Sequence, residues 1–293
     1  MNLFIKYQKN LKIFLIFFLA IFFISHFAKA SVKEKIIDSR IVSTNLCIDS
    51  LLIALIGTQG IVAVSSIAGD QRYSLITNEV RNLKKVNFNA ESIYALRPTL
   101  VLASNFSSAK THLALTKLGI EIKLVKYAKS VKDVEDNLIY IGELLGVPKK
   151  ATEIIASIRA TEQKPVSSAK LDALQYSPNR YVNGRHSLIS DIFRRSGFNR
   201  PSLLTLTPQG AFLSSELIIK SEPSLLLLDK NKTDPESKKN SHYHNAVYKL
   251  ANQTAVIHVA QKQWSCGSPA IVDLINQLGK KYAQILRSKN AKK

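Results

Sequence analysis

The loops that follow the predicted strands carry aromatic, arginine and polar side chains suited to holding a large ligand. The set comprises Asn45, Cys47, Tyr73, Asn105, Phe106, Tyr181, Arg185, Phe212 and Trp264. Aromatic rings offer apolar walls to a flat ligand, and a guanidinium pairs with carboxylate or phosphate groups on it. Trp264 lies in a polar, Gly-containing loop, which favours contact with a ligand over burial in a core. Tyr73 and Phe106 could equally pack against their own lobe.

These loops come together only if the strands before them run parallel. Short apolar strands alternate with helical segments up to residue 125, and the alternation returns after residue 170. This pattern predicts parallel sheets covered by helices, and ligands bind outside the carboxyl ends of parallel strands. The rule selects the loops after the strands predicted at 40–44, 61–66, 100–103, 171–176, 225–229 and 255–259.

Between the two alternating regions lies a segment with a different pattern. Residues 130–159 carry apolar side chains at helical spacing and no strand pattern, so we interpret them as one long connector helix, with Pro148 able to begin a second helical segment. The predicted organisation is a signal peptide at 1–30, an N-terminal α/β lobe at 31–129, a helical connector at 130–165, a C-terminal α/β lobe at 166–288 and a basic tail at 289–293.

One pattern occurs once in each predicted lobe. Residues 91–98 (E-S-I-Y-A-L-R-P) and 216–223 (E-L-I-I-K-S-E-P) both place a Glu seven residues before a Pro, and an apolar run follows each Pro. Each copy predicts a short helix that ends before its proline, followed by a buried strand. Glu91 and Glu216 therefore occupy the same position in two lobes, which suggests a shared role beyond the stabilisation that a carboxylate gives to a helix N-terminus.

The N-terminal residues have the features of an export signal. Three lysines precede an apolar run at 13–24, and the A-K-A sequence at 28–30 fits a signal peptidase site, so we expect cleavage after Ala30 and a periplasmic protein. An uncleaved membrane anchor is the alternative, but the run is shorter than the roughly 20 residues that span a bilayer. Cys47 and Cys266, the only cysteines, could pair in such an oxidising compartment or stay free.

The charge balance is strongly basic. The formal net charge is +20, and removing residues 1–30 takes away four lysines and no acidic residue, which leaves +16. The cations are spread along the chain rather than interleaved with aromatic residues, so we expect no nucleic-acid partner.

Other kinds of site have weaker support in the sequence. The chain has no G-x-S-x-G, Gly-rich phosphate loop or H-E-x-x-H motif, which argues against an enzyme. His242 and His244 have no evident third partner, so we expect no metal site built by the protein and no resident cofactor. His186 could reach a metal centre in the ligand, although capping of the next helix is its commoner role.

The order and spacing of these motifs resemble those of the periplasmic substrate-binding proteins of ABC importers for cobalamin, ferric siderophores and haem. The resemblance rests on residues 40–49 (R-I-V-S-T-N-L-C-I-D), both Glu-to-Pro repeats, 187–197 (S-L-I-S-D-I-F-R-R-S-G) and 263–269 (Q-W-S-C-G-S-P). It covers residues 40–288 and implies two α/β lobes joined by a long helix, with a metal chelate held between them.

The resemblance also implies partners and residue roles. Glu91 and Glu216 correspond to the glutamates that project toward the membrane permease, and one subgroup also carries a Cys after its first strand. We hypothesise a bond between Cys47 and Cys266, with free thiols near a metal centre as the alternative. We expect a monomer whose ligand is a corrinoid or a ferric siderophore, with haem as the next candidate. An exported enzyme or a receptor for free metal ions are the alternatives.

Overall fold

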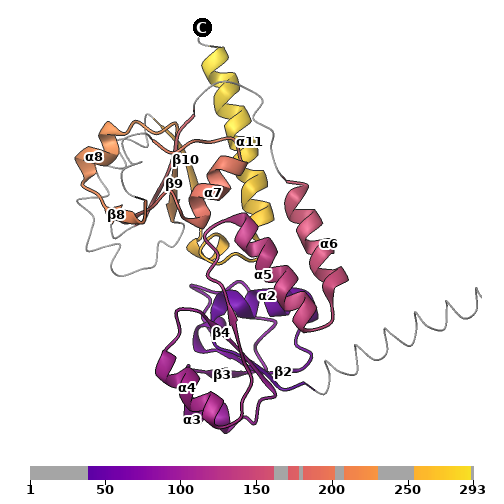
Figure 1. The fold of residues 1–293 in the computed structure, drawn as a ribbon. Coiled ribbons are helices and arrows are strands. Elements are labelled where there is room, and N and C mark those ends of the chain that lie inside the picture. Colours follow the sequence, from indigo (N-terminus) through magenta and orange to yellow (C-terminus); the bar gives the residue numbers. More distant parts are fainter. Residues whose placement is uncertain (1–38, 162–170, 178–180, 202–207, 230–253, 292–293) are drawn as a thin grey trace, which may run out of the picture.

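The chain forms two α/β lobes with a pair of helices between them (Figure 1). The computed structural model describes residues 39–161, 171–177, 181–201, 208–229 and 254–291. Each lobe contains a parallel sheet with helices packed against it, which confirms the predicted fold class. The predicted signal peptide lies outside the described residues.

The N-terminal lobe is built on a five-stranded parallel sheet with strand order β3-β2-β1-β4-β5. Its strands are β1 (Ile41–Ser43), β2 (Ile61–Ser65), β3 (Lys84–Val86), β4 (Leu100–Ser104) and β5 (Ile122–Val125). Its helices are α2 (Leu46–Ile56), α3 (Ala90–Tyr94), α4 (Ala109–Lys117) and the short 3-10 helix η1 (Ser66–Gly69). Strands β1, β2 and β4 match predicted strands, and β5 ends the alternating region predicted up to residue 125. Strand β3 is an addition, because its exposed Lys-Lys start hides the apolar pattern of a strand.

The C-terminal lobe contains a three-stranded parallel sheet with order β10-β9-β6 and a separate two-stranded antiparallel ribbon. Its strands are β6 (Ala173–Tyr176), β7 (Tyr181–Asn183), β8 (Gly210–Phe212), β9 (Leu225–Asp229) and β10 (Ala255–Val259). Its helices are α7 (Leu188–Arg195), α8 (Ser215–Lys220), η3 (Gln261–Gln263) and α11 (Ile271–Asn290). The ribbon of β7 and β8 forms where the sequence indicated only loops. Helix α11 continues into the first residues of the predicted basic tail.

The connector is helical, as predicted, but consists of two helices rather than one continuous helix. Helix α5 (Val131–Leu144) ends before Gly146, which has φ 73°, and Pro148 begins α6 (Pro148–Arg159). The chain reverses there, and the two helices pack side by side (Figure 1). Proline fits the first turn of a helix because that turn needs no intrahelical N–H donor, so Pro148 starts α6 after the break.

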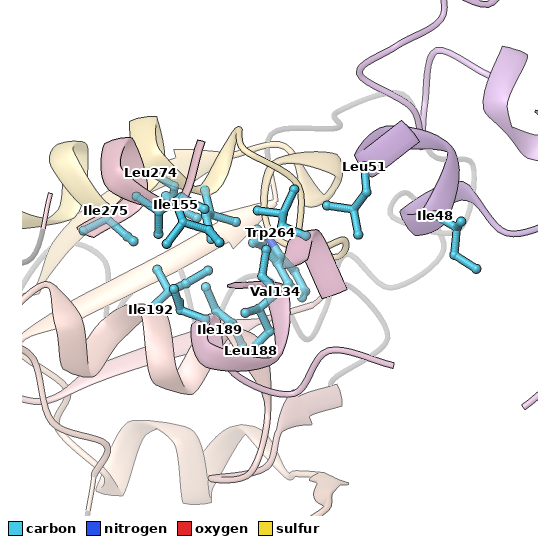
Figure 2. Close-up of a cluster of buried hydrophobic side chains, with 14 of the residues drawn as sticks. Ile48, Leu51, Val134, Ile155, Leu188, Ile189, Ile192, Trp264, Leu274 and Ile275 are labelled. Carbon is cyan, nitrogen blue, oxygen red and sulfur yellow. The ribbon is translucent and has the colours of Figure 1, made fainter. Parts of the chain in front are cut away.

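The helical pair and both lobes share one hydrophobic core. Its buried side chains come from α2, α5, α6, α7 and α11 and from strands of both sheets. Figure 2 shows this packing, with Leu51 of the N-terminal lobe on one side of Trp264 and Val134 of the connector on the other. A continuous core holds the two lobes in a fixed relation, because packed interiors do not deform smoothly.

The two Glu-to-Pro repeats adopt the same local structure. In each copy the Glu is the second residue of a short helix, and the fully buried Ile93 or Ile218 holds that helix to its lobe. The residue before each proline has a positive φ, 48° at Arg97 and 40° at Glu222. The proline disfavours the right-handed helical conformation at the residue before it, so each helix must end there. The predicted helix-to-strand unit is confirmed in both lobes.

Within the part of the chain that the structure describes, no helix combines the length and apolar character that crossing a membrane requires.

Candidate functional site

A disulfide joins the two lobes at the base of their junction. It links Cys47, in the first turn of α2, to Cys266, in the loop between η3 and α11, with 4.9 Å between the Cα atoms. Asn45 caps α2, because its side-chain oxygen accepts the backbone N–H groups of Cys47 and Ile48. Asn45 thus has a local structural role in addition to its place at the junction.

The innermost part of the junction is nearly filled. A cavity of about 20 Å³ lies between Asn45 and Tyr127 on one side and Ser265 and Gly267 on the other. This space suits a water molecule and excludes a chelate. A side chain at Gly267 would collide with Val134, so glycine allows this loop to approach the connector closely. Any large ligand must lie further out between the lobes.

The N-terminal lobe presents an exposed aromatic pair at the carboxyl edge of its sheet. Phe106 follows β4 and Tyr127 follows β5, and their rings meet edge to face at 5.8 Å. Phe106 is 72% exposed. Asn105 supports the pair, because its side-chain oxygen accepts the backbone N–H of Tyr127. An exposed ring held by its neighbours is poised to contact a ligand.

The C-terminal lobe presents a second aromatic pair on the β7–β8 ribbon. Tyr181 and Phe212 face each other across the two strands, with 5.3 Å between ring centroids, and Phe212 is 68% exposed. The Tyr181 hydroxyl donates to the Gln209 carbonyl at 2.9 Å. Gly210 has φ 105°, and a Cβ there would lie 2.4 Å from the Tyr181 oxygen. Glycine is therefore required beneath the tyrosine.

Trp264 lies in a different environment from the one its loop sequence suggested. Its side chain is 7% exposed and belongs to the shared core beside Leu51 and Val134 (Figure 2). The expectation that this loop is not core-like is wrong for Trp264 itself, because the disulfide at Cys266 draws the loop into the junction.

Tyr73 is exposed near a direct contact between the lobes. The Arg72 guanidinium carbon lies 5.3 Å from the centroid of the Tyr73 ring, and Arg72 also pairs with Asp70 at 2.6 Å. The Lys262 ammonium, from the C-terminal lobe, donates to the Gln71 carbonyl at 3.0 Å. This loop therefore helps to join the lobes at the edge of their junction.

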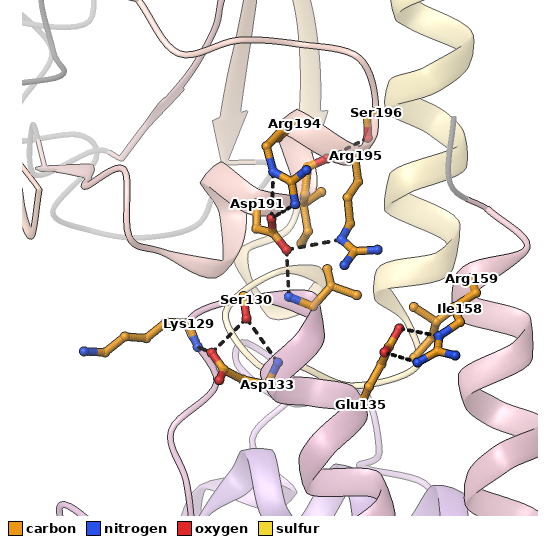
Figure 3. A network of polar contacts seen from close by, with 12 residues as sticks. Lys129, Ser130, Asp133, Glu135, Ile158, Arg159, Asp191, Arg194, Arg195 and Ser196 are labelled. Carbon is orange, nitrogen blue, oxygen red and sulfur yellow. Dashed lines mark hydrogen bonds and ion pairs between the residues drawn. The ribbon is translucent and has the colours of Figure 1, made fainter. Parts of the chain in front are cut away.

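A polar network fastens the connector to the C-terminal lobe (Figure 3). The Asp191 carboxylate accepts the backbone N–H of Val131 at the start of α5 and pairs with Arg194 and Arg195. Burial would raise the pKa of Asp191, but these partners outweigh it and lower that pKa. A second buried carboxylate, Glu135 on α5, receives two hydrogen bonds from Arg159 on α6.

Arg185 lies beside this network, at the turn between β7 and α7. It borders a pocket of about 530 Å³ whose other walls include Lys129 and Gln209. The Arg185 Nε donates to His186 Nε2 at 3.1 Å, so His186 touches the arginine and borders the same pocket. The pocket opens between the connector and the C-terminal lobe, where the carboxyl-edge rule places a ligand.

Asp49 is the most perturbed acid that the structure describes. It lies on α2, fully buried, and accepts hydrogen bonds from the backbone N–H and the hydroxyl of Ser65 at the end of β2. Burial raises the pKa of Asp49 to about 6, against the opposing effect of hydrogen bonding to Ser43 and Ser65 and of the Lys85 charge.

Glu91 and Glu216 are exposed, each in the first turn of its short helix. The backbone N–H of Glu216 and the Ser214 hydroxyl lower the pKa of the Glu216 carboxyl, so it stays charged at neutral pH. Both glutamates thus lie at the surface, at equivalent positions of the two lobes.

Sequence reasoning omitted two residues of this region, Tyr127 and Lys129. Both follow β5, and the carboxyl-edge rule that selected the other loops selects this one as well. Among the described residues, no group of three His, Cys, Asp or Glu side chains could hold a metal ion. His242 and His244 lie outside those residues.

Comparison with known proteins agrees with this two-lobed architecture. The family described as periplasmic binding protein matches residues 41–256. The chain belongs to this family. Its relatives are binding proteins of transport systems rather than enzymes, and they indicate an extracytoplasmic location. One relative is the uncharacterized ABC transporter substrate-binding lipoprotein YvrC of Bacillus subtilis, 27% identical over 145 residues. That match covers 42% of this chain and 46% of YvrC, so this chain spans about half the length of its relative.

Solved structures of the same fold come from proteins that are named for different ligands. The periplasmic haem-binding protein BhuT, in complex with two haems, superposes with a TM-score of 0.68 at 15% identity, over 85% of this chain and 99% of BhuT. The vitamin B12 binding protein BtuF of Vibrio cholerae gives 0.62 at 18% identity, over 84% and 98%. The Fe3+-hydroxamate transport protein of Saccharomonospora viridis gives 0.63 at 18% identity, over 83% and 93%. At these identities the likeness establishes the fold.

Proposed function

We propose that this protein captures a metal chelate between its two lobes and delivers it to an ABC importer. The observation that carries the proposal is the exposed aromatic pair on each lobe, Phe106 with Tyr127 and Tyr181 with Phe212. Each pair lies at the carboxyl edge of its lobe, and an exposed ring loses its contact with water favourably when a flat apolar ligand covers it.

Within this class, a corrinoid or a ferric siderophore is the foremost ligand and haem comes next. A large ligand is favoured because a molecule that touches both aromatic pairs must extend from one lobe to the other. The solved relatives are named for haem, vitamin B12 and ferric hydroxamate, which are all metal chelates. A receptor for bare metal ions would instead need converging His or carboxylate ligands.

Titration with purified chelates tests the proposed binding. Haemin, cyanocobalamin, ferrichrome and ferric citrate are each added to the mature protein in a calorimeter, with ferric ion alone as the control. We expect saturable binding of at least one chelate, and weaker binding of that chelate to the Phe106→Ala/Phe212→Ala variant. Binding of ferric ion alone, or of none of these compounds, would contradict the proposal.

Export and delivery complete the proposed function. We infer that residues 1–30 direct the chain to the periplasm and are removed after Ala30, and that the mature protein docks as a monomer on a membrane permease. Glu91 and Glu216 are the proposed docking residues, because they are exposed at equivalent positions of the two lobes. Charge pairs at such contacts set the orientation of docking and the association rate.

The double variant Glu91→Ala/Glu216→Ala tests this docking role. We expect it to bind chelate as the wild type does but to support uptake of that chelate into cells at least about tenfold more slowly, because permease cations lose their partners. The matched control is Glu79→Ala/Glu143→Ala, which removes two other exposed glutamates without ion pairs to described residues. Equal uptake by both variants, or a loss of chelate affinity, would show that Glu91 and Glu216 do not dock the permease.

A further inference from the structure

The pocket beside Arg185 has an excess of positive charge. Its charged and polar walls include Lys129, Arg185, His186, Asp191, Arg194 and Gln209, which we call the cationic pocket. Three cationic side chains thus face one carboxylate. The pocket measures about 530 Å³, which is large enough to admit part of a bound molecule rather than a single water.

The one carboxylate of the pocket is already occupied by other partners. Asp191 accepts the backbone N–H of Val131 at 2.9 Å and pairs with Arg194 at 2.6 Å and Arg195 at 3.2 Å, as Figure 3 shows. These partners also lower the pKa of Asp191, so its charge persists but is neutralised by two guanidinium groups. Asp191 therefore leaves the charges of Lys129 and Arg185 uncompensated.

Lys129 and Arg185 are exposed and form no ion pair with any carboxylate that the structure describes. Lys129 bonds to Asp133 through its backbone N–H, and its side chain extends away from that residue (Figure 3). The Arg185 Nε is held by His186 at 3.1 Å, which leaves the terminal guanidinium nitrogens for another acceptor. One free cation thus comes from each side of the pocket.

The cationic pocket is linked to both aromatic pairs, to one through the sequence and to the other through a hydrogen bond. Lys129 lies two residues after Tyr127, and Gln209, in the pocket wall, accepts the hydroxyl of Tyr181. An apolar ligand body against the rings would therefore bring the edge of the ligand to the two cations. A carboxylate is the natural group for this position, because guanidinium binds it through paired hydrogen bonds and ammonium through charge.

We propose that the cationic pocket binds a carboxylate at the edge of the chelate, so that the protein selects carboxylate-bearing chelates over those with an uncharged edge. This inference rests on the proposed function, and it narrows the ligand class to chelates that combine an apolar face with an anionic edge. Lys129 and Arg185 are the residues that determine this selectivity.

Calorimetric titration with matched probes tests the inference. The probes are haemin and its dimethyl ester, which differ only in the charge of two carboxylates, together with ferric citrate, cyanocobalamin and ferrichrome. We expect a carboxylate-bearing probe to bind best. If haemin binds, its dimethyl ester should bind about tenfold to a hundredfold more weakly than haemin itself. The variant Lys129→Gln/Arg185→Gln should weaken binding of the acid by a similar factor and leave binding of an uncharged probe unchanged.

The control variant is Arg81→Gln/Lys149→Gln, which removes the same two charges at exposed positions that border no pocket described above. It should leave the affinity for the acid within about twofold of the wild type, because exposed distant charges are screened by salt. If the protein binds only ferrichrome or cyanocobalamin, or binds acid and ester equally, the inference is wrong while the proposed function stands. If no chelate binds, both are wrong.

Discussion

Asp49 is the residue whose chemistry differs most from that of its type in water. The folded chain buries its carboxylate, which raises its pKa from the ordinary 3.8 to about 6. Between these values the folded state keeps a proton that the unfolded chain has lost, so the free energy of unfolding falls as pH rises. The penalty is complete above about pH 6 and amounts to roughly 2–3 kcal/mol.

The substitution Asp49→Asn tests this assignment. An amide oxygen can still accept the hydrogen bonds from Ser65, but it carries no charge to desolvate. We expect the difference in unfolding free energy between variant and wild type to grow in favour of the variant from pH 4 to pH 7, as measured by urea denaturation. The exposed Asp273→Asn serves as the control. A difference that does not change with pH would contradict the raised pKa of Asp49.

The connector illustrates how one buried charge organises two elements. Glu135 on α5 is 3% exposed at its side chain, and Arg159 on α6 donates two hydrogen bonds to its carboxylate, the shorter at 2.7 Å. This pair fixes the register of the two helices, because a carboxylate cannot remain buried and ionised without such a partner. The pair is thus part of what makes the connector rigid.

Removal of the arginine should therefore destabilise the fold. We expect Arg159→Ala to lower the free energy of unfolding by about 2 kcal/mol, less than for a fully buried pair because Arg159 is itself more than half exposed. Lys150→Ala, which breaks the exposed pair with Glu153 on the same helix, should cost less than about 0.5 kcal/mol. Equal losses in chemical denaturation would show that burial of Glu135 has no special effect.

At the same scale, a helix or strand could be predicted from the sequence where local backbone preferences determine its conformation. The Glu-to-Pro units were predictable because proline excludes helix at Arg97 and Glu222 and because apolar runs follow. The β7–β8 ribbon could not be predicted, because its two three-residue strands pair only where Gly210 allows the Tyr181 side chain to lie close to the backbone. The break between α5 and α6 was signalled by Pro148, but a reversal of the chain there depends on tertiary packing.

The candidate site was predictable in part, for a related reason. The carboxyl-edge rule found Phe106, Tyr181, Arg185 and Phe212, which the structure leaves accessible beside the junction. It did not anticipate that Trp264 would be buried, because burial is decided by the disulfide and the core that surround its loop. Residue type and loop position alone do not distinguish a residue that lines the site from one that is buried in the core beneath it.

The whole molecule is two lobes that several contacts hold together. A shared hydrophobic core, the disulfide between Cys47 and Cys266 and the hydrogen bond from Lys262 to Gln71 join the lobes, and Asp191 fastens the connector to the C-terminal lobe. A cross-link that closes a loop of this length restricts the unfolded chain strongly. We therefore expect the aromatic pairs to form a largely preformed site and the lobes to move little when a ligand enters.

The central claim is that this molecule carries a metal chelate. Native mass spectrometry of the protein purified from the periplasm of its own host tests that claim most directly, because the ligand need not be guessed. We expect one additional species per chain, with the isotope pattern of iron or cobalt and the mass of an organic chelate, and its loss on denaturation. The claim would be contradicted if the protein carried only bare metal ions. It would also be contradicted if the protein carried no ligand although its host had been supplied with chelates and had imported them.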